Sequence, residues 1–130
     1  MVCIDSDIII EFLRNKESGV KTIRKIKQED RELLTTSINS FEVLKGIQDS
    51  PHEKQEGTKS FLSKFKILEF DFEVSEEAAQ IFETLKKEGQ PIELADIMIA
   101  SIAIKNNEPL LTENKKHFKR MEKFGLILNN

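Results

Sequence analysis

The sequence predicts an α/β fold, with a central, mostly parallel sheet of four to five strands between two layers of helices. Short apolar and β-branched runs alternate with longer segments whose apolar residues recur at helical spacing. Each connection between the predicted strands contains at least one helix, which is what parallel pairing requires. Glycine and proline are scattered singly, without a repeat or linker, so residues 1–130 are expected to form a single domain.

The first half of the chain predicts three strands and their helices. Residues 2–5 form a short apolar strand, and residues 6–13 repeat apolar positions at helical spacing. A second helix is expected at about 20–29, after a break at 15–19. Residues 33–38 are rich in β-branched types and predict a strand, after which Ser40 is expected to cap a helix that stops near Gly46. Pro51 is expected to open a helix to about Lys64, and residues 66–70 to form the third strand.

The second half predicts two more strands. Ser75, followed by two glutamates, is expected to start a helix that runs to about Lys87 and ends at Gly89. Residues 93–106 form the most apolar helix, residues 109–112 a strand, 115–121 a short basic helix and 126–128 a last strand.

Composition excludes several classes of protein. The net charge of −3 argues against general electrostatic coating of nucleic acid. Two basic runs, at 14–27 and 115–123, are candidates for phosphate contacts or solvated helix faces. Cys3 is the only cysteine and lies in an apolar run, so a buried thiol in a reducing compartment is expected. No signal-type or membrane-spanning stretch is apparent, and the expected location is the cytoplasm, without a membrane partner.

Three carboxylates stand in apolar surroundings: Asp5, Glu42 and Asp96. Asp5 is expected at the carboxyl end of the first strand, the edge at which ligands of parallel sheets bind. Glu42 is expected in the first turn of its helix, and Asp96 faces an apolar stripe. Each has a structural alternative: Asp5 as a helix cap, Glu42 as an exposed residue near Lys45, and Asp96 as a first-turn aspartate.

Taken together, the three acids predict one metal site. Converging carboxylates repel one another unless protons or cations neutralise them. Oxygen ligands favour Mg²⁺ or Mn²⁺ over Zn²⁺, and the two histidines, His52 and His117, have no metal-ligand spacing. A water on such an ion is a nucleophile suited to phosphodiester hydrolysis.

Four ordered stretches, "VCIDSDIIIEFL", "SINSFEVLKG", "ELADIMIASIAI" and "LLTENKKHF", resemble the four motifs of PIN domains, in particular those of small VapC-type toxins of toxin–antitoxin pairs. The resemblance covers nearly the whole chain. It implies a PIN-like α/β/α fold and a Mg²⁺- or Mn²⁺-dependent endoribonuclease. It also implies an RNA substrate, a homodimer, and a cognate antitoxin that inserts basic or polar side chains into the acidic site.

The resemblance assigns roles by position. Asp5, Glu42 and Asp96 match the metal-site acids of the family, and Ser6 and Thr112 match hydroxyl residues that position carboxylates or phosphate. The fourth motif departs from its commonest form. Asn114 stands where many relatives have Asp, and His117 precedes Phe118 where others place another Asp. Asn114 is a candidate catalytic residue that supplies no charge, Glu113 is the alternative fourth acid, and Glu93 is a candidate helper on the helix of Asp96.

Some of the same residues also suggest other functions. The "DSD" after an apolar strand also resembles the opening of haloacid-dehalogenase-type phosphatases, but Asp96 has no adjacent acid. A receiver-type signalling domain would need a phosphoacceptor that "LLTTSI" lacks. The main non-enzymatic alternative is a PIN-like module that binds RNA or protein without cleavage.

Overall fold

The architecture was examined in a computed structural model, which describes residues 1–29, 31–91 and 93–129. The described strands form one four-stranded sheet of order β3-β2-β1-β4. Every pairing is parallel: Cys3 aligns with Leu34 on one side and with Leu110 on the other, and Leu34 aligns with Lys66. The predicted α/β class and parallel sheet are therefore confirmed. The strands are β1 (Val2–Ile4), β2 (Leu33–Thr36), β3 (Lys66–Leu68) and β4 (Leu110–Leu111).

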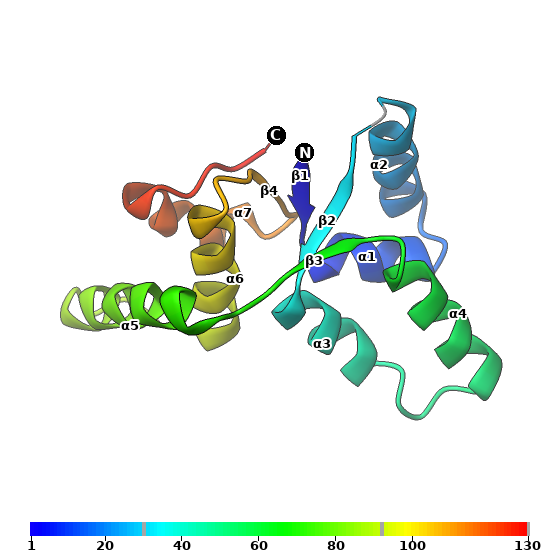
Figure 1. The fold of residues 1–130 in the computed structure, drawn as a ribbon, viewed down its shortest axis with the longest axis horizontal. Helices are drawn as coiled ribbons and strands as arrows, with labels where there is room; N and C mark the ends of the chain where they lie inside the picture. Colours follow the sequence, from blue (N-terminus) through cyan, green and yellow to red (C-terminus); the bar gives the residue numbers. More distant parts are fainter. Residues whose placement is uncertain (30, 92, 130) are drawn as a thin grey trace.

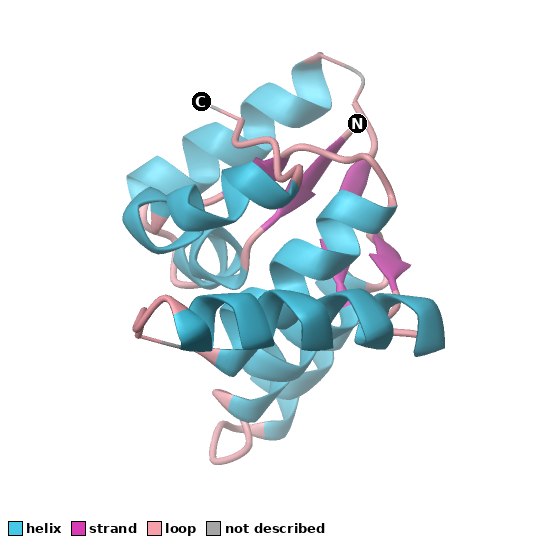
Figure 2. Ribbon diagram, turned by 90° about the vertical axis from the view of Figure 1, so that its left-hand side faces the viewer, coloured by secondary structure: helices cyan, strands magenta, loops and turns pink. Residues whose placement is uncertain are grey.

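Helices cover both faces of the sheet (Figure 1). Turned by 90°, the molecule shows helices in front of the strands and behind them (Figure 2). The helices are α1 (Ser6–Leu13), α2 (Glu17–Gln28), α3 (Ser37–Lys45), α4 (His52–Leu62), α5 (Phe72–Lys87), α6 (Leu94–Lys105) and α7 (Lys115–Phe118), followed by the 3₁₀ helix η1 (Lys119–Phe124). Among the described residues, none of the helices combines the length and the apolar character needed to cross a bilayer.

The alternation of side chains along β1 divides the core into two layers. Val2 and Ile4 pack with α1, α2, α3 and α4 on one face of the sheet. Cys3 packs with α5, α6 and η1 on the other face. Because both faces are covered, the central strand β1 and its neighbour β4 are continuous apolar runs instead of alternating ones. Burial raises the pKa of the Cys3 thiol to about 12, with a further contribution from the negative charge of Asp5, so the expected buried thiol is confirmed.

Two predicted caps are wrong because a nearer polar side chain takes the position. Helix α3 begins at Ser37, since the Thr36 hydroxyl accepts the Asn39 N–H. The Ser40 hydroxyl instead donates to the carbonyl of Ser37 within the helix. Strand β2 therefore ends at Thr36, two residues before the predicted boundary.

Helix α5 shows the same shift. It starts at Phe72, because the Asp71 carboxylate accepts the Val74 N–H. The Ser75 hydroxyl donates to the Phe72 carbonyl inside the first turn, so its predicted role as the start of the helix is wrong.

Two other boundaries differ from the prediction. Helix α2 begins at Glu17, and Gly19 lies inside it because α2 crosses close to α1: a Cβ at Gly19 would lie 2.6 Å from the Phe12 nitrogen. The predicted last strand is reduced to a parallel bridge between Leu128 and Leu110. Leu110 holds this segment to β4: its carbonyl accepts from the Asn129 N–H, and its own N–H donates to the Ile127 carbonyl.

Candidate active site

The acidic residues predicted from sequence gather at the edge of the sheet where its strands end. Asp5 directly follows β1, helix α3 with Glu42 directly follows β2, and Thr112 directly follows β4. Because the carboxyl ends of parallel strands share one edge, residues far apart in the chain meet there. Asp96 reaches the same edge from the first turn of α6.

The Asp5 carboxylate is the centre of this edge. It is 6% exposed and accepts three strong hydrogen bonds: from the Ser6 N–H at 2.8 Å, the Asn39 side-chain amide at 2.8 Å and the Thr112 hydroxyl at 2.6 Å. The bond from Ser6 makes Asp5 the N-cap of α1, as the structural alternative proposed. The other two donors come from α3 and from beyond β4, which a cap alone does not require. They compensate the cost of burying a charge at this position.

Glu42 is tied to Asp5 through one hydroxyl. Ser6 Oγ donates to Glu42 Oε1 at 2.7 Å and lies 3.4 Å from Asp5 Oδ1. Since α3 begins at Ser37, Glu42 sits in the second turn, and its predicted place in the first turn is wrong. The alternative partner, Lys45, instead holds its Nζ 5.9 Å from the centre of the Phe41 ring.

Asp96 is half-enclosed, with its side chain 16% exposed. Burial raises the pKa of its carboxyl, the negative charge of Asp5 raises it further, and His117 lowers it in part. Asp96 Oδ2 lies 3.5 Å from His117 Nδ1. Asp96 occupies the first turn of α6, as its structural alternative required. It also lies close enough to the acidic cluster for the charge of Asp5 to raise its pKa. The negative charge of Glu93, the N-cap residue of α6, raises the pKa of Asp96 by a smaller amount.

The fourth motif enters the site through Thr112. Its hydroxyl donates to Asp5 and accepts the backbone N–H of Asn114 at 2.9 Å. The Asn114 amide lies 3.1 Å from His117 Nδ1, which in turn lies 3.5 Å from Asp96 Oδ2. Glu113 turns to α1, where its carboxyl pairs with Glu11 and its pKa rises to about 7. Glu113 therefore does not take the place of the fourth acid beside Asp5.

Three residues of the site had no role assigned from sequence: Asn39, Asp7 and His117. Asn39 is fully buried and links Asp5 to the Thr36 hydroxyl, which donates to Asn39 Oδ1 at 2.7 Å. Burial raises the pKa of Asp7 to about 6, with the charge of Asp5 adding to the shift. Asp7 also accepts the Glu113 N–H at 3.0 Å. Both Asn39 and Asp7 lie within the quoted motifs, and the available signal was a polar residue inside an apolar stretch.

The donor set suits a hard divalent cation in its chemistry. No three His, Cys, Asp or Glu side chains within residues 1–29, 31–91 and 93–129 form a ready-made metal cage. Mg²⁺ does not need one, because it keeps several waters and is usually held by one or two carboxylates. Burial and, to a smaller extent, the charge of Asp5 raise the pKa of Asp96, and a cation beside it would favour its ionised form. Asp5 and Asp96 fit this role, with Glu42 held close by Ser6.

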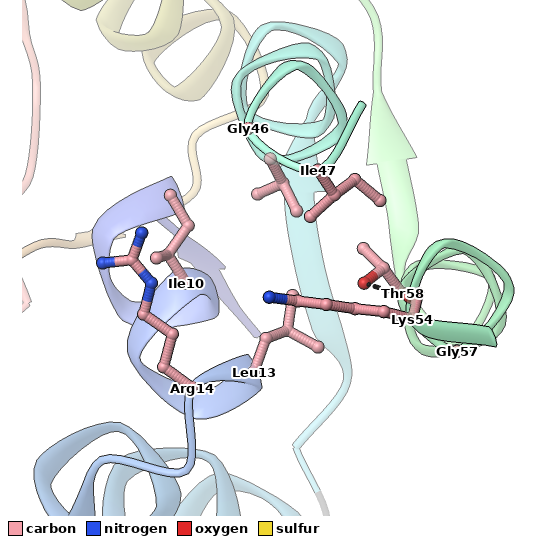
Figure 3. A pocket seen from close by; sticks show the side chains of 9 residues that line it. Ile10, Leu13, Arg14, Gly46, Ile47, Lys54, Gly57 and Thr58 are labelled. Atoms are coloured by element: carbon pink, nitrogen blue, oxygen red, sulfur yellow. Dashed lines mark hydrogen bonds between the residues drawn. The ribbon is translucent and has the colours of Figure 1, made fainter. Parts of the chain in front are cut away.

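A separate apolar cavity lies between α1, α3 and α4 (Figure 3). It has a volume of about 270 Å³ and includes Ile10, Leu13, Val43 and Ile47 in its lining. Two basic residues also line it: Arg14 from α1, and Lys54, whose side chain extends from α4 toward α1 (Figure 3). It shares α1 and α3 with the acidic edge but none of its carboxylates.

Fold and site together define an α/β protein with an acidic, hydrogen-bonded centre at the carboxyl edge of a parallel sheet. A family model for the PIN domain matches residues 2–124. The chain belongs to the PIN-domain family, as its four motifs indicated.

This chain is similar to known proteins both in sequence and in structure. Ribonuclease VapC1 of Methanocaldococcus jannaschii is 32% identical over 125 residues, which cover 96% of this chain and 84% of that protein. Ribonuclease VapC2 of Rickettsia felis is 27% identical over 98% of this chain and 95% of its own. The structure of VapBC2 from Rickettsia felis bound to a promoter DNA fragment superposes with a TM-score of 0.83 at 26% identity, covering 100% of this chain and 98% of that one. VapBC-1 from nontypeable Haemophilus influenzae gives a TM-score of 0.83 at 25% identity, with coverage of 100% and 98%.

Proposed function

We propose that this chain is an endoribonuclease that depends on Mg²⁺ or Mn²⁺ and acts as the toxin of a toxin–antitoxin pair. The observation that carries the proposal is the meeting of Asp5, Glu42 and Asp96 from three separate segments, with Asp5 buried and hydrogen-bonded by Asn39 from the helix of Glu42 and by Thr112 from a fourth segment. Relatives named ribonuclease VapC, similar over nearly the whole chain, support the RNA substrate.

The residues of this chain prepare the site for a cation. Ser6, Asn39 and Thr112 donate hydrogen bonds to the buried Asp5 carboxylate and so hold it in place. Ser6 also fixes Glu42. A divalent ion held by Asp5, Asp96 and Glu42 would activate water for attack on phosphorus and stabilise the charge that develops on the phosphate.

RNA would approach along the basic face of α7. Lys115, Lys116 and Lys119 are exposed and line one shallow hollow with Glu122 and Leu128. The other basic residues of this run are engaged: Arg120 donates to the Pro91 carbonyl, and Lys123 pairs with Glu88. Replacing the three lysines by alanine should weaken RNA binding and reduce the salt slope by about 2, as expected for three lost contacts to a single strand. An unchanged slope would identify the run as a solvated face.

Cleavage assays test the proposal directly. Purified protein is incubated with structured RNAs and Mn²⁺ or Mg²⁺, beside Asp5→Asn and Asp96→Asn purified in the same way. We expect both variants to lose activity by roughly 100-fold or more, since each removes a metal-site acid. Undiminished cleavage in both variants would show that the site is wrong. Binding without cleavage in any metal would favour the non-enzymatic module.

The apolar cavity supports a protein partner. The solved relatives include VapBC complexes, and the lining of Ile10, Leu13, Val43 and Ile47 beside Arg14 and Lys54 suits an apolar side chain of an antitoxin with an acidic neighbour. Leu13→Glu should abolish co-purification with the antitoxin while RNA cleavage continues. Phe72→Glu, at a residue that is 77% exposed on another helix, is the control. Retained binding in Leu13→Glu would place the partner elsewhere. The homodimer implied by the resemblance stays a prediction, which light scattering of the purified protein would check.

A further inference from the structure

His117 is held at the acidic edge by its neighbours in the chain. The next residue, Phe118, is fully buried, and the His117 N–H donates to the Asn114 carbonyl at 3.1 Å. Arg120 donates to the carbonyl of His117 and also to that of Pro91. Because Pro91 precedes the helix that carries Asp96, this guanidinium ties the segment of His117 to the segment of Asp96.

The His117 side chain is turned toward Asp96 without a good hydrogen bond to it. Nδ1 lies 3.5 Å from Asp96 Oδ2, beyond the range of about 2.7–3.2 Å that N–H···O bonds prefer. Two ligand atoms on adjacent corners of an octahedral ion with bonds of about 2.1 Å are about 3 Å apart. The separation of Nδ1 and Oδ2 is about 0.5 Å longer than this, so an ion shared by the two atoms would draw them together and replace the hydrogen bond between Nδ1 and the Asn114 amide. The ring is 50% exposed, so an ion has access to it from solvent.

The charge at this position also favours an added cation. Asp96 is 16% exposed at the edge that also holds the carboxylates of Asp5 and Glu42, which Ser6 links. Asn114, whose amide lies 3.1 Å from His117 Nδ1, brings no charge.

We propose that His117 is a ligand of the divalent cation, beside Asp96, and that its nitrogen makes the site select a first-row transition ion such as Mn²⁺ over Mg²⁺. This inference rests on the metal-dependent function proposed above. Imidazole is a ligand of transition metals, whereas Mg²⁺ is held by carboxylate, carbonyl and water oxygens. Aspartate at this position would remove the preference.

Pulsed electron paramagnetic resonance on the Mn²⁺-loaded protein tests the proposal. A bound imidazole nitrogen modulates the Mn²⁺ echo, and labelling histidine with ¹⁵N should change that modulation. The chain has two histidines, and His52 lies on α4 with its side chain 84% exposed. We expect His117→Ala to lose the histidine modulation and His52→Ala to keep it. Circular dichroism and thermal melting of both variants verify that they fold.

Metal affinity supplies a second measurement. His117→Ala should weaken Mn²⁺ binding by roughly tenfold or more, with a smaller effect on Mg²⁺, and His117→Asp should lower the ratio of Mn²⁺ to Mg²⁺ affinity. Mn²⁺ bound without histidine modulation, or modulation lost in His52→Ala, would overturn the role of His117. If RNA cleavage supported by Mn²⁺ persists in that case, the nuclease proposal is retained and only the role of His117 is rejected. A protein that binds no Mn²⁺ would overturn both the ligand and the metal dependence.

Discussion

The substitution Asn39→Asp tests the hydrogen-bonded centre most directly. It keeps the shape of the side chain and replaces a neutral donor by a carboxylate. The Asn39 nitrogen is 2.8 Å from Asp5 Oδ1, and both residues are buried. With the two charge centres about 4 Å apart and an effective dielectric constant of about 20, the repulsion is about 4 kcal/mol. That is a large part of the roughly 5–15 kcal/mol by which domains are stable.

Urea unfolding without divalent metal measures this effect. At neutral pH we expect Asn39→Asp to lower the free energy of unfolding by about 4 kcal/mol. The control Asn39→Ala removes the donor without adding a charge and should cost about 2–3 kcal/mol. Below about pH 5 the Asp variant should regain stability, because two adjacent carboxylates can share one proton.

Two results would refute this reasoning. If Asn39→Asp and Asn39→Ala were equally stable at every pH, no charge repulsion would exist at this position, and Asp5 would not be the anionic centre of the site. If neither variant lost stability, the contact between Asn39 and Asp5 would not be part of the native structure.

Further substitutions test other parts of the molecule. Burial and Asp5 raise the pKa of Asp96, so its ionised form destabilises the fold and metal-free stability falls as pH rises from about 3.8 through the raised pKa. Asp96→Asn should remove this fall and raise the neutral-pH melting temperature; a lower melting temperature would indicate a structural cap. Gly19→Ala should destabilise by about 1–3 kcal/mol, because its Cβ would meet the backbone of α1. Gly57→Ala, with open space around it, should stabilise by about 0.5–1 kcal/mol, and chemical denaturation compares the two. The hydrogen bond to Glu11 raises the pKa of Glu113 to about 7 from 4.5, so stability should fall as pH rises between these values. Glu113→Gln should flatten that part of the pH profile of the melting temperature, and an unaltered profile would contradict the pairing.

The local sequence pattern was sufficient to predict which helices and strands the chain forms and in what order. The strands at 2–4, 33–36, 66–68 and 110–111 all lie within predicted ranges, because short β-branched and apolar runs between helical repeats have few other solutions in a buried parallel sheet. The N-cap residues of the helices were harder to predict from sequence. At the start of α3, Thr36 and Ser40 are both good N-cap residues by type, and the choice depends on which hydroxyl faces the free N–H groups.

The candidate site, too, was predicted from sequence only in part. Asp5, Glu42 and Asp96 were recognisable as carboxylates in apolar surroundings, and the ordered motifs gave their joint meaning. Asn39 and His117 were not recognisable, because an asparagine in a helix and a histidine in a basic run are ordinary residues until their neighbours are known. His117 becomes meaningful only because Arg120 and Phe118 fix the turn that brings its ring to Asp96.

By itself the sequence determined the α/β class, the family and the acids of the site, since these depend on residue type, spacing and order along the chain. Only the tertiary structure decided which donors hold Asp5, that Glu113 turns away to Glu11, that His117 meets Asp96, and that an apolar cavity opens between α1, α3 and α4. These are relations between residues distant in the chain: 21 positions separate Asp96 from His117, 34 separate Asp5 from Asn39 and 107 separate Asp5 from Thr112. Packing of the helices on the sheet sets such distances, and no local pattern encodes them.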